Sequence, residues 1–92
     1  MPYRITAKAN VYDDLKVIPL PFRDKIQAAI FSLADNPRPV GAIKMTEYKN
    51  AYRIRVGNYR IGYQIFDREL VVTVVAASER GKIYQLMKRR LK

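Results

Sequence analysis

The first forty residues combine one short extended segment with two stretches of helical spacing. Residues 2–7, "PYRITA", predict a short strand. Apolar side chains then recur at helical spacing over 8–18, at Val11, Leu15 and Ile18. The prolines of "PLP" at 19–21 end this helix, because proline cannot continue one. A second stripe runs up to "DNPRP" at 35–39 and predicts the other arm of an antiparallel helical hairpin, with Phe22, Ile26, Ile30 and Leu33 on one face.

Residues 51–65, "AYRIRVGNYRIGYQI", alternate apolar and polar side chains, which is typical of strands with one buried face. Gly57-Asn58 fits a two-residue type II′ hairpin turn. This turn fixes the pairing by counting: Val56 with Tyr59, Arg55 with Arg60, Ile54 with Ile61, and Arg53 with Gly62. One face is then an apolar core face, made of Tyr52, Ile54, Val56, Tyr59, Ile61, Tyr63 and Ile65. The other is a cationic surface with a bare patch, made of Arg53, Arg55, Arg60, Gly62 and Gln64.

The remaining segments complete an α+β domain. "LVVTVVAAS" at 70–78 is β-branched and almost continuously apolar, which predicts a central strand covered on both faces. Residues 81–91 predict a basic helix, and a short strand near 42–45 stays open. The expected order is β-α-α-β-β-β-α in a single domain over 1–92. The fold class is α+β, a small antiparallel sheet with an N-terminal helical hairpin and a C-terminal helix.

The composition excludes several kinds of chemistry. There is no cysteine and no histidine, so we expect no disulfide, no zinc site, no histidine base, and neither metal nor cofactor. We also expect no signal peptide, and no apolar run reaches the roughly 20 residues of a membrane span. Eighteen Lys and Arg against eight Asp and Glu give a net charge of +10. This surplus indicates a polyanionic partner, which leaves nucleic acid, an acidic protein or an anionic membrane surface.

The arginines of residues 51–65 come without any Asp or Glu in that stretch. Arg55 and Arg60 lie directly opposite each other in the predicted hairpin, where like charges destabilise the fold. Guanidinium groups bind phosphate bidentately at any physiological pH, so this surface suits a phosphate. Arg80 follows the apolar strand and Tyr84 lies one turn into the last helix, which predicts a pocket of four cations and one aromatic hydroxyl. The alternative is a solvated surface, with Arg80 near a helix start and Tyr84 packed on the sheet.

These residues, in this order, resemble the RelE/ParE superfamily of bacterial toxins from type II toxin–antitoxin systems, and specifically its RelE-like ribonucleases. The resemblance covers nearly the whole length, through "LADNPRP", "YRIRVGNYRIGYQI", the apolar strand and "SERGKIY". RelE-like toxins cut messenger RNA in the ribosomal A site, where the 2′-hydroxyl attacks the adjacent phosphate. The resemblance therefore implies a metal-independent endoribonuclease that inhibits translation in the bacterial cytoplasm. It also implies an acidic antitoxin that holds the toxin in a hetero-oligomer.

The resemblance assigns roles by position. It implies a catalytic site of Arg53 and Arg55 on the first hairpin strand, Arg60 on the second, Arg80 after the last strand, and Tyr84 in the last helix. Family members often carry lysines where this chain has Arg53 and Arg55. Arginine, with a pKa above roughly 12, cannot accept a proton, so catalysis is expected to rest on orientation and electrostatic stabilisation. Glu47 and Glu79 stay open as bases or surface charges. The expected contacts to messenger or ribosomal RNA are Lys44, Lys49, Lys82, Lys88, Arg89 and Arg90, with Lys8, Lys16 and Lys92 as further contacts to RNA or antitoxin.

Two other functions stay open. ParE-like members share the fold but poison DNA gyrase, and they generally lack the arginine–tyrosine combination near the C-terminus. Arg80 and Tyr84 therefore favour the ribonuclease. A non-catalytic module that binds RNA or the ribosome would explain the charge of +10, but would give no reason for these two residues to accompany the arginine surface.

Overall fold

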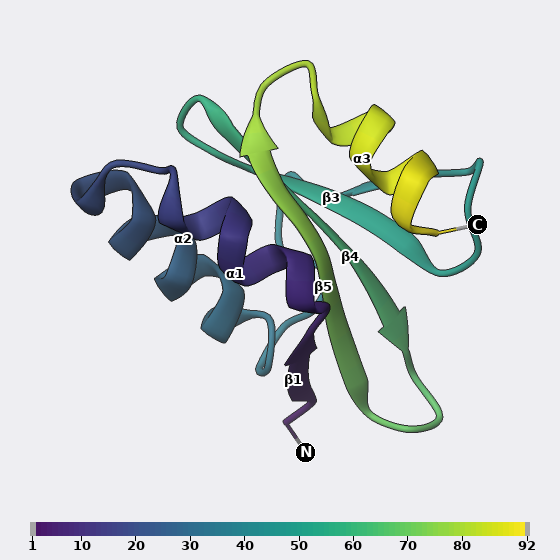
Figure 1. The fold of residues 1–92 in the computed structure, drawn as a ribbon. Coiled ribbons are helices and arrows are strands. Elements are labelled where there is room, and N and C mark those ends of the chain that lie inside the picture. Colours follow the sequence, from purple (N-terminus) through teal and green to yellow (C-terminus); the bar gives the residue numbers. More distant parts are fainter. Residues whose placement is uncertain (1, 92) are drawn as a thin grey trace.

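The computed structural model describes residues 2–91. Within this range the strands form one sheet in the order β1-β5-β4-β3-β2, with α1 and α2 on one side and α3 on the other (Figure 1). In chain order the elements are β1 (Arg4–Ala7), α1 (Ala9–Lys16), α2 (Leu20–Ser32), β2 (Ile43–Lys44), β3 (Ala51–Val56), β4 (Tyr59–Phe66), β5 (Val71–Glu79) and α3 (Ile83–Arg90). None of these helices has the length and apolar composition that crossing a membrane requires.

The predicted α+β class, with its helical hairpin, central apolar strand and C-terminal helix, is confirmed. The sheet differs from the prediction in two details. The short strand left open near 42–45 is present as β2, which pairs with β3 and adds a strand to the expected order. The sheet is also mixed, because β1 runs parallel to β5, with Arg4 opposite Val71. Pattern alone could not show this orientation, because the two paired segments are 67 residues apart in the chain.

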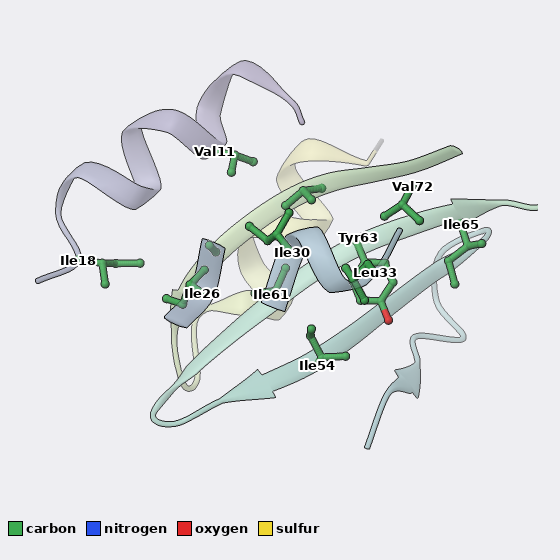
Figure 2. Close-up of a cluster of buried hydrophobic side chains, with 12 residues drawn as sticks. Val11, Ile18, Ile26, Ile30, Leu33, Ile54, Ile61, Tyr63, Ile65 and Val72 are labelled. Atoms are coloured by element: carbon green, nitrogen blue, oxygen red, sulfur yellow. The ribbon is translucent and has the colours of Figure 1, made fainter. Parts of the chain in front are cut away.

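The helical hairpin covers the apolar face of the sheet. It buries Val11 of α1, Ile18 of the α1–α2 connection, Ile26 and Ile30 of α2, and Leu33, which directly follows α2. Figure 2 shows them gathered over Ile54, Ile61 and Tyr63 of β3 and β4. The predicted break at "PLP" is confirmed, since α1 ends at Lys16 and α2 starts at Leu20. Pro21 is tolerated in the first turn of α2, where its missing N–H would have no helical partner.

The opposite face of the sheet carries α3. Ile83 and Met87 of α3 are buried against Val75 and Ala76 of β5. These two consecutive β5 residues share one face because the β4–β5 pairing shifts register at Gly62/Tyr63, and such a bulge places an extra side chain there. The bare patch expected at Gly62 is therefore wrong. The Met87 thioether lies so close above Gly62 that a Cβ there would require the methionine side chain to move.

Candidate functional site

The β3–β4 hairpin brings three arginines onto one face of the sheet. All four predicted pairs are confirmed, including Arg55 opposite Arg60 and Arg53 opposite Gly62. Gly57 has a φ of +61°, as the first central position of a type II′ turn requires. The apolar face of the same hairpin packs into the helical hairpin, so the alternation of side chains leaves the three guanidinium groups on the side that carries α3.

Arg80 joins this group from the end of β5. Its backbone N–H donates to the carbonyl oxygen of Asn58 over 3.0 Å, which fixes it beside the hairpin turn. The pKa of Arg60 is lowered, first by partial burial and then by the positive charges of Arg55, Arg53 and Arg80. Because each of these charges acts on Arg60, the four arginines form one cationic site. We call Arg53, Arg55, Arg60 and Arg80 the arginine cluster.

Tyr84 reaches the arginine cluster from α3. Its hydroxyl accepts a hydrogen bond from Nε of Arg53 over 3.0 Å, and the Arg53 guanidinium lies 5.5 Å from the centre of its ring. Met87 lies one turn further along α3 and fills the space above Gly62. Gly62 is the residue that pairs with Arg53 across the hairpin. The glycine therefore lets α3 approach the sheet closely enough for Tyr84 to meet Arg53. Tyr84 is 43% exposed, so it is not a core residue of this face, and its hydroxyl is within reach of a bound ligand.

The arginine cluster has no carboxylate partner within residues 2–91. The ion pairs there join Lys16 to Asp13, Arg38 to Asp67 and Arg90 to Asp14. Arg55 and Arg60 donate only to nearby backbone carbonyls, those of Gly57 and Tyr59. Most of the guanidinium N–H groups are therefore free for an oxyanion. The described residues also contain no group of acidic side chains that could hold a metal ion.

The structure places neither Glu47 nor Glu79, the two carboxylates considered as a possible base, to take a proton from a ligand of the arginine cluster. Glu79 pairs with Tyr59 across β4 and β5, and directly paired residues project to the same face. Tyr59 packs against the helical hairpin, so Glu79 projects away from the arginine cluster. Glu47 is exposed in the loop between β2 and β3, with no hydrogen bond or ion pair from its side chain in the described part of the chain.

Arg90 does not belong with the expected RNA contacts. Its guanidinium forms a bidentate ion pair with Asp14, at 2.7 and 3.0 Å, and also donates to the carbonyl oxygen of Val75. Only 12% of its side chain is exposed, so Arg90 is a structural residue. Sequence reasoning missed Asp14, although a signal was present: it lies on the same helical stripe as Val11 and Ile18, where a charged residue indicates a buried partner.

The other expected RNA contacts are dispersed over the surface. Lys44 lies on β2, Lys49 in the next loop, Lys82 just before α3, and Lys88 and Arg89 on α3, all exposed. Lys8 is half-buried, and Lys16 forms an exposed pair with Asp13. Lys92 lies outside the described residues. Another arginine, Arg38, was not foreseen: it forms a bidentate pair with Asp67 and stacks on Tyr52, on the opposite side of the hairpin from the arginine cluster.

Comparison with known families matches almost the whole chain to one of them. Residues 3–84 match the family described as the ParE toxin of the type II toxin–antitoxin system, parDE. The chain belongs to this ParE toxin family. A protein of Escherichia coli whose name describes it as RelE-like toxin is 24% identical over 96 residues, and the alignment covers all of both chains.

Solved structures of RelE toxins share the fold. A double-arginine mutant of Escherichia coli RelE in the free state aligns over the full length of both chains, with a TM-score of 0.81 and 20% identity. In a RelB–RelE antitoxin–toxin complex from Methanococcus jannaschii, the matching chain has a TM-score of 0.68 and 28% identity, covering 87% of this chain and 95% of that one. This member of the ParE toxin family therefore has the RelE fold, as the resemblance implied.

Proposed function

We propose that this toxin is a ribosome-dependent endoribonuclease that cuts messenger RNA and thereby inhibits translation. The observation that carries the proposal is the arginine cluster with Tyr84: four cations without a carboxylate, one of them bonded to the tyrosine hydroxyl. Guanidinium groups match the oxygens of a phosphodiester, and their fixed charge stabilises the extra negative charge of the transition state.

In the proposed reaction the 2′-hydroxyl of the RNA attacks the adjacent phosphorus in line. The leaving 5′-oxygen departs from the opposite side, which gives a cyclic phosphate and a 5′-hydroxyl end. Arg60 and Arg80 would hold the phosphate oxygens, and Tyr84 would position Arg53 and orient the attacking hydroxyl. Because arginine cannot accept the proton, most of the rate would come from alignment and charge stabilisation. The ribosome would supply the alignment of the RNA strand.

The partners follow from the family and the charge. The matching Methanococcus jannaschii toxin was solved with its antitoxin. We propose that this chain likewise binds a cognate antitoxin in a hetero-oligomer in the bacterial cytoplasm, and that an acidic segment of that antitoxin covers part of the +10 surface. Lys44, Lys49, Lys82, Lys88 and Arg89 would contact ribosomal RNA or the antitoxin through charge, without reading sequence.

One observation favours a second function. The family model that matches is that of ParE toxins, and inhibition of DNA gyrase is the activity that the resemblance attaches to ParE-like members. The arginine cluster with Tyr84 weighs against it, because a gyrase inhibitor gives no reason for an aromatic hydroxyl bonded to an unpaired arginine.

The test compares one messenger RNA in a reconstituted translation reaction and as naked RNA, with cleavage mapped by primer extension. We expect cuts within the translated region that need ribosomes in the reaction. A parallel assay measures supercoiling by gyrase at the same toxin concentration. Equal cutting of naked RNA would overturn the ribosome dependence, and loss of supercoiling without RNA cuts would establish the gyrase function instead.

A further inference from the structure

A cavity adjoins the arginine cluster at the end of the sheet. It has a volume of about 510 Å³ and forms where the first turn of α2, the β3–β4 turn and the end of β5 meet. Its lining residues are Phe22, Asn58, Tyr59, Glu79, Arg80 and Gly81. The proposed reaction uses only Arg80 of this set, so the other five are unexplained by it.

Two aromatic rings form one wall of this cavity. The ring centres of Phe22 and Tyr59 lie 5.7 Å apart, with 42° between their planes. Tyr59 packs on the core from its other side, which holds the pair in place. Phe22 is 45% exposed, so an apolar ring faces solvent inside the cavity. Flat, fixed rings of this kind are the platforms on which unpaired nucleobases stack.

Arg80 connects the cavity to the arginine cluster. Arg80 lines the cavity, where its backbone N–H donates to the carbonyl oxygen of Asn58, and its charge also lowers the pKa of Arg60. A phosphate held between Arg60 and Arg80 would therefore lie at the mouth of the cavity. The base of the nucleotide next to this phosphate would reach the aromatic wall, because each phosphate of a single strand directly joins two nucleotides.

We propose that this cavity is a nucleobase subsite, which takes one unpaired base next to the phosphate held by the arginine cluster. The base stacks on the exposed ring of Phe22 and contacts the ring of Tyr59, whose plane is tilted by 42° from that of Phe22. Glu79 carries an exposed carboxylate at the rim and accepts from an exocyclic amino group, so adenine, cytosine and guanine are favoured over uracil. This inference rests on the proposed function, since it makes the cavity the element that selects where the RNA is cut.

The test measures binding without cleavage. The probes are 2′-O-methyl RNA trinucleotides, either intact or lacking the base on the 5′ or the 3′ side of the central phosphate. Affinity is measured by NMR titration of the free toxin. We expect removal of one of these bases to weaken binding about 5- to 150-fold, the range for one stacked base. Equal affinity for the intact and both abasic trinucleotides would overturn the proposal.

Variants of α2 locate the effect. Phe22→Ala should remove the difference between intact and abasic probes while leaving the affinity for the abasic probe unchanged. Phe22→Leu keeps the apolar volume without a ring and should behave in the same way, which protects the test if the alanine variant is unstable. Phe31→Ala is the matched control: this phenylalanine is 69% exposed on the same helix but lines a different cavity. A preference for the base that survives in both Phe22 variants would place the subsite elsewhere.

Base identity gives a second readout. Glu79→Gln should reduce the preference for amino-bearing bases over uracil by several-fold, because an amide both donates and accepts. In the ribosome assay, Phe22→Leu should still cut but at a different distribution of positions. If no cleavage occurs with the wild type while the abasic probes bind more weakly, the proposed ribonuclease fails and the subsite stands. If cleavage occurs and all probes bind equally, the reverse holds.

Discussion

Arg38 and Arg60 lie on opposite faces of the β3–β4 hairpin, and their electrostatic surroundings are opposite. The pKa of Arg38 is raised, first by its hydrogen bond to Asp67 and then by the one to Tyr52. The pKa of Arg60 is lowered, by partial burial and by three other arginines. Arg90 belongs with Arg38, because it too has a bidentate carboxylate partner. The chain thus contains arginines that are paired with carboxylates and a cluster that is not.

The difference separates structural from functional charge. A paired arginine joins elements far apart in the sequence, as Arg90 joins α3 to α1 across 76 residues. Removing it leaves a carboxylate without its partner. An unpaired arginine beside other arginines destabilises the free protein and gains a partner only when an anion binds. The same substitution should therefore lower stability at one kind of site and activity at the other.

The largest expected effect is on stability, at the buried pair. Arg90→Met leaves the Asp14 carboxylate buried and uncompensated, which costs about 3–5 kcal/mol and should lower the Tm by more than about 10 °C. Thermal melts followed by circular dichroism measure this. The control is the double variant Asp14→Asn with Arg90→Met. It removes both charges. The asparagine side chain at position 14 would keep an oxygen that can accept the hydrogen bond which the backbone N–H of Ala77 now donates to Asp14. We expect the double variant to regain much of the lost Tm; equal losses in both variants would mean that packing of the arginine stem, not charge, matters there.

The next effect is on activity, at the arginine cluster. Arg60→Ala removes a repulsion from the free protein and a contact from the transition state, where one such donor is worth about 3 kcal/mol or about 100-fold in rate. We expect a Tm equal to or slightly above that of the wild type, and loss of growth arrest. Arg80→Ala should lose activity in the same way. Arg68→Ala, an exposed arginine in the β4–β5 turn, is the matched control. An Arg60 variant that unfolds would mean that Arg60 is a structural arginine. A variant that is stable and still toxic would mean that Arg60 is a solvated surface residue.

The hairpin shows how much the sequence could predict. Its register followed from a two-residue turn, because a turn of fixed length leaves only one way to pair the strands. The same alternation put Arg53, Arg55 and Arg60 on one face. The apolar strand at 70–78 was predicted as central because a β-branched and almost continuously apolar strand needs cover on both sides. These features depend on local spacing, which a single sequence contains in full.

The docking of α3 depends on tertiary contacts and could not be predicted in this way. Nothing near Gly62 in the sequence indicates that Met87 fills the space above it, so a bare patch was expected where the helix lies. Arg90 was grouped with Lys88 and Arg89 because the three are adjacent, although only Arg90 turns inward to meet Asp14. The parallel pairing of β1 with β5 was missed for the same reason. Each of these depends on partners more than 20 residues away in the chain.

Tyr84 tests how an unpaired arginine is positioned. Tyr84→Phe removes the hydroxyl that accepts from Arg53 but keeps the ring 5.5 Å from the guanidinium. We expect a loss of activity of about 10-fold, since a hydrogen bond to a charged group contributes about 1.5–3 kcal/mol and only part of it acts on the reaction. Tyr84→Ala, which loses the ring as well, should be weaker still. Rates of cleavage on ribosomes at saturating toxin measure both. Full activity of Tyr84→Phe would show that only the ring matters.

The exposed lysines outside the arginine cluster are expected to affect binding to ribosomes and not the position of the cut. Replacing Lys44, Lys82 and Lys88 together with glutamine should weaken binding to ribosomes and lower the slope of log affinity against log salt by about 2, while the cut positions stay the same. The control triple replaces Arg4, Lys25 and Arg68, three exposed cations on other parts of the surface. Equal loss in both triples would mean that net charge alone drives association. A changed cut position in the lysine triple would move these residues into the site.

The smallest effect is expected at the exposed pair of Arg38 and Asp67, whose side chains are 44% and 57% exposed. The pKa of the Asp67 carboxyl is lowered, first by its hydrogen bond from Arg38 and then by that from Tyr3. A carboxyl whose pKa is lower in the folded than in the unfolded protein adds stability above its unfolded pKa, which is about 3.9, and loses it as the pH falls through the folded value. Asp67→Asn should therefore melt slightly below the wild type at pH 7, and the gap should close as the pH falls below about 4. Melts between pH 2 and pH 7 measure it, and growth arrest should be unaffected because Asp67 contacts none of the arginine cluster. A gap that stays constant over this range would mean that the pair contributes through geometry, and that its charge, screened by water, adds nothing.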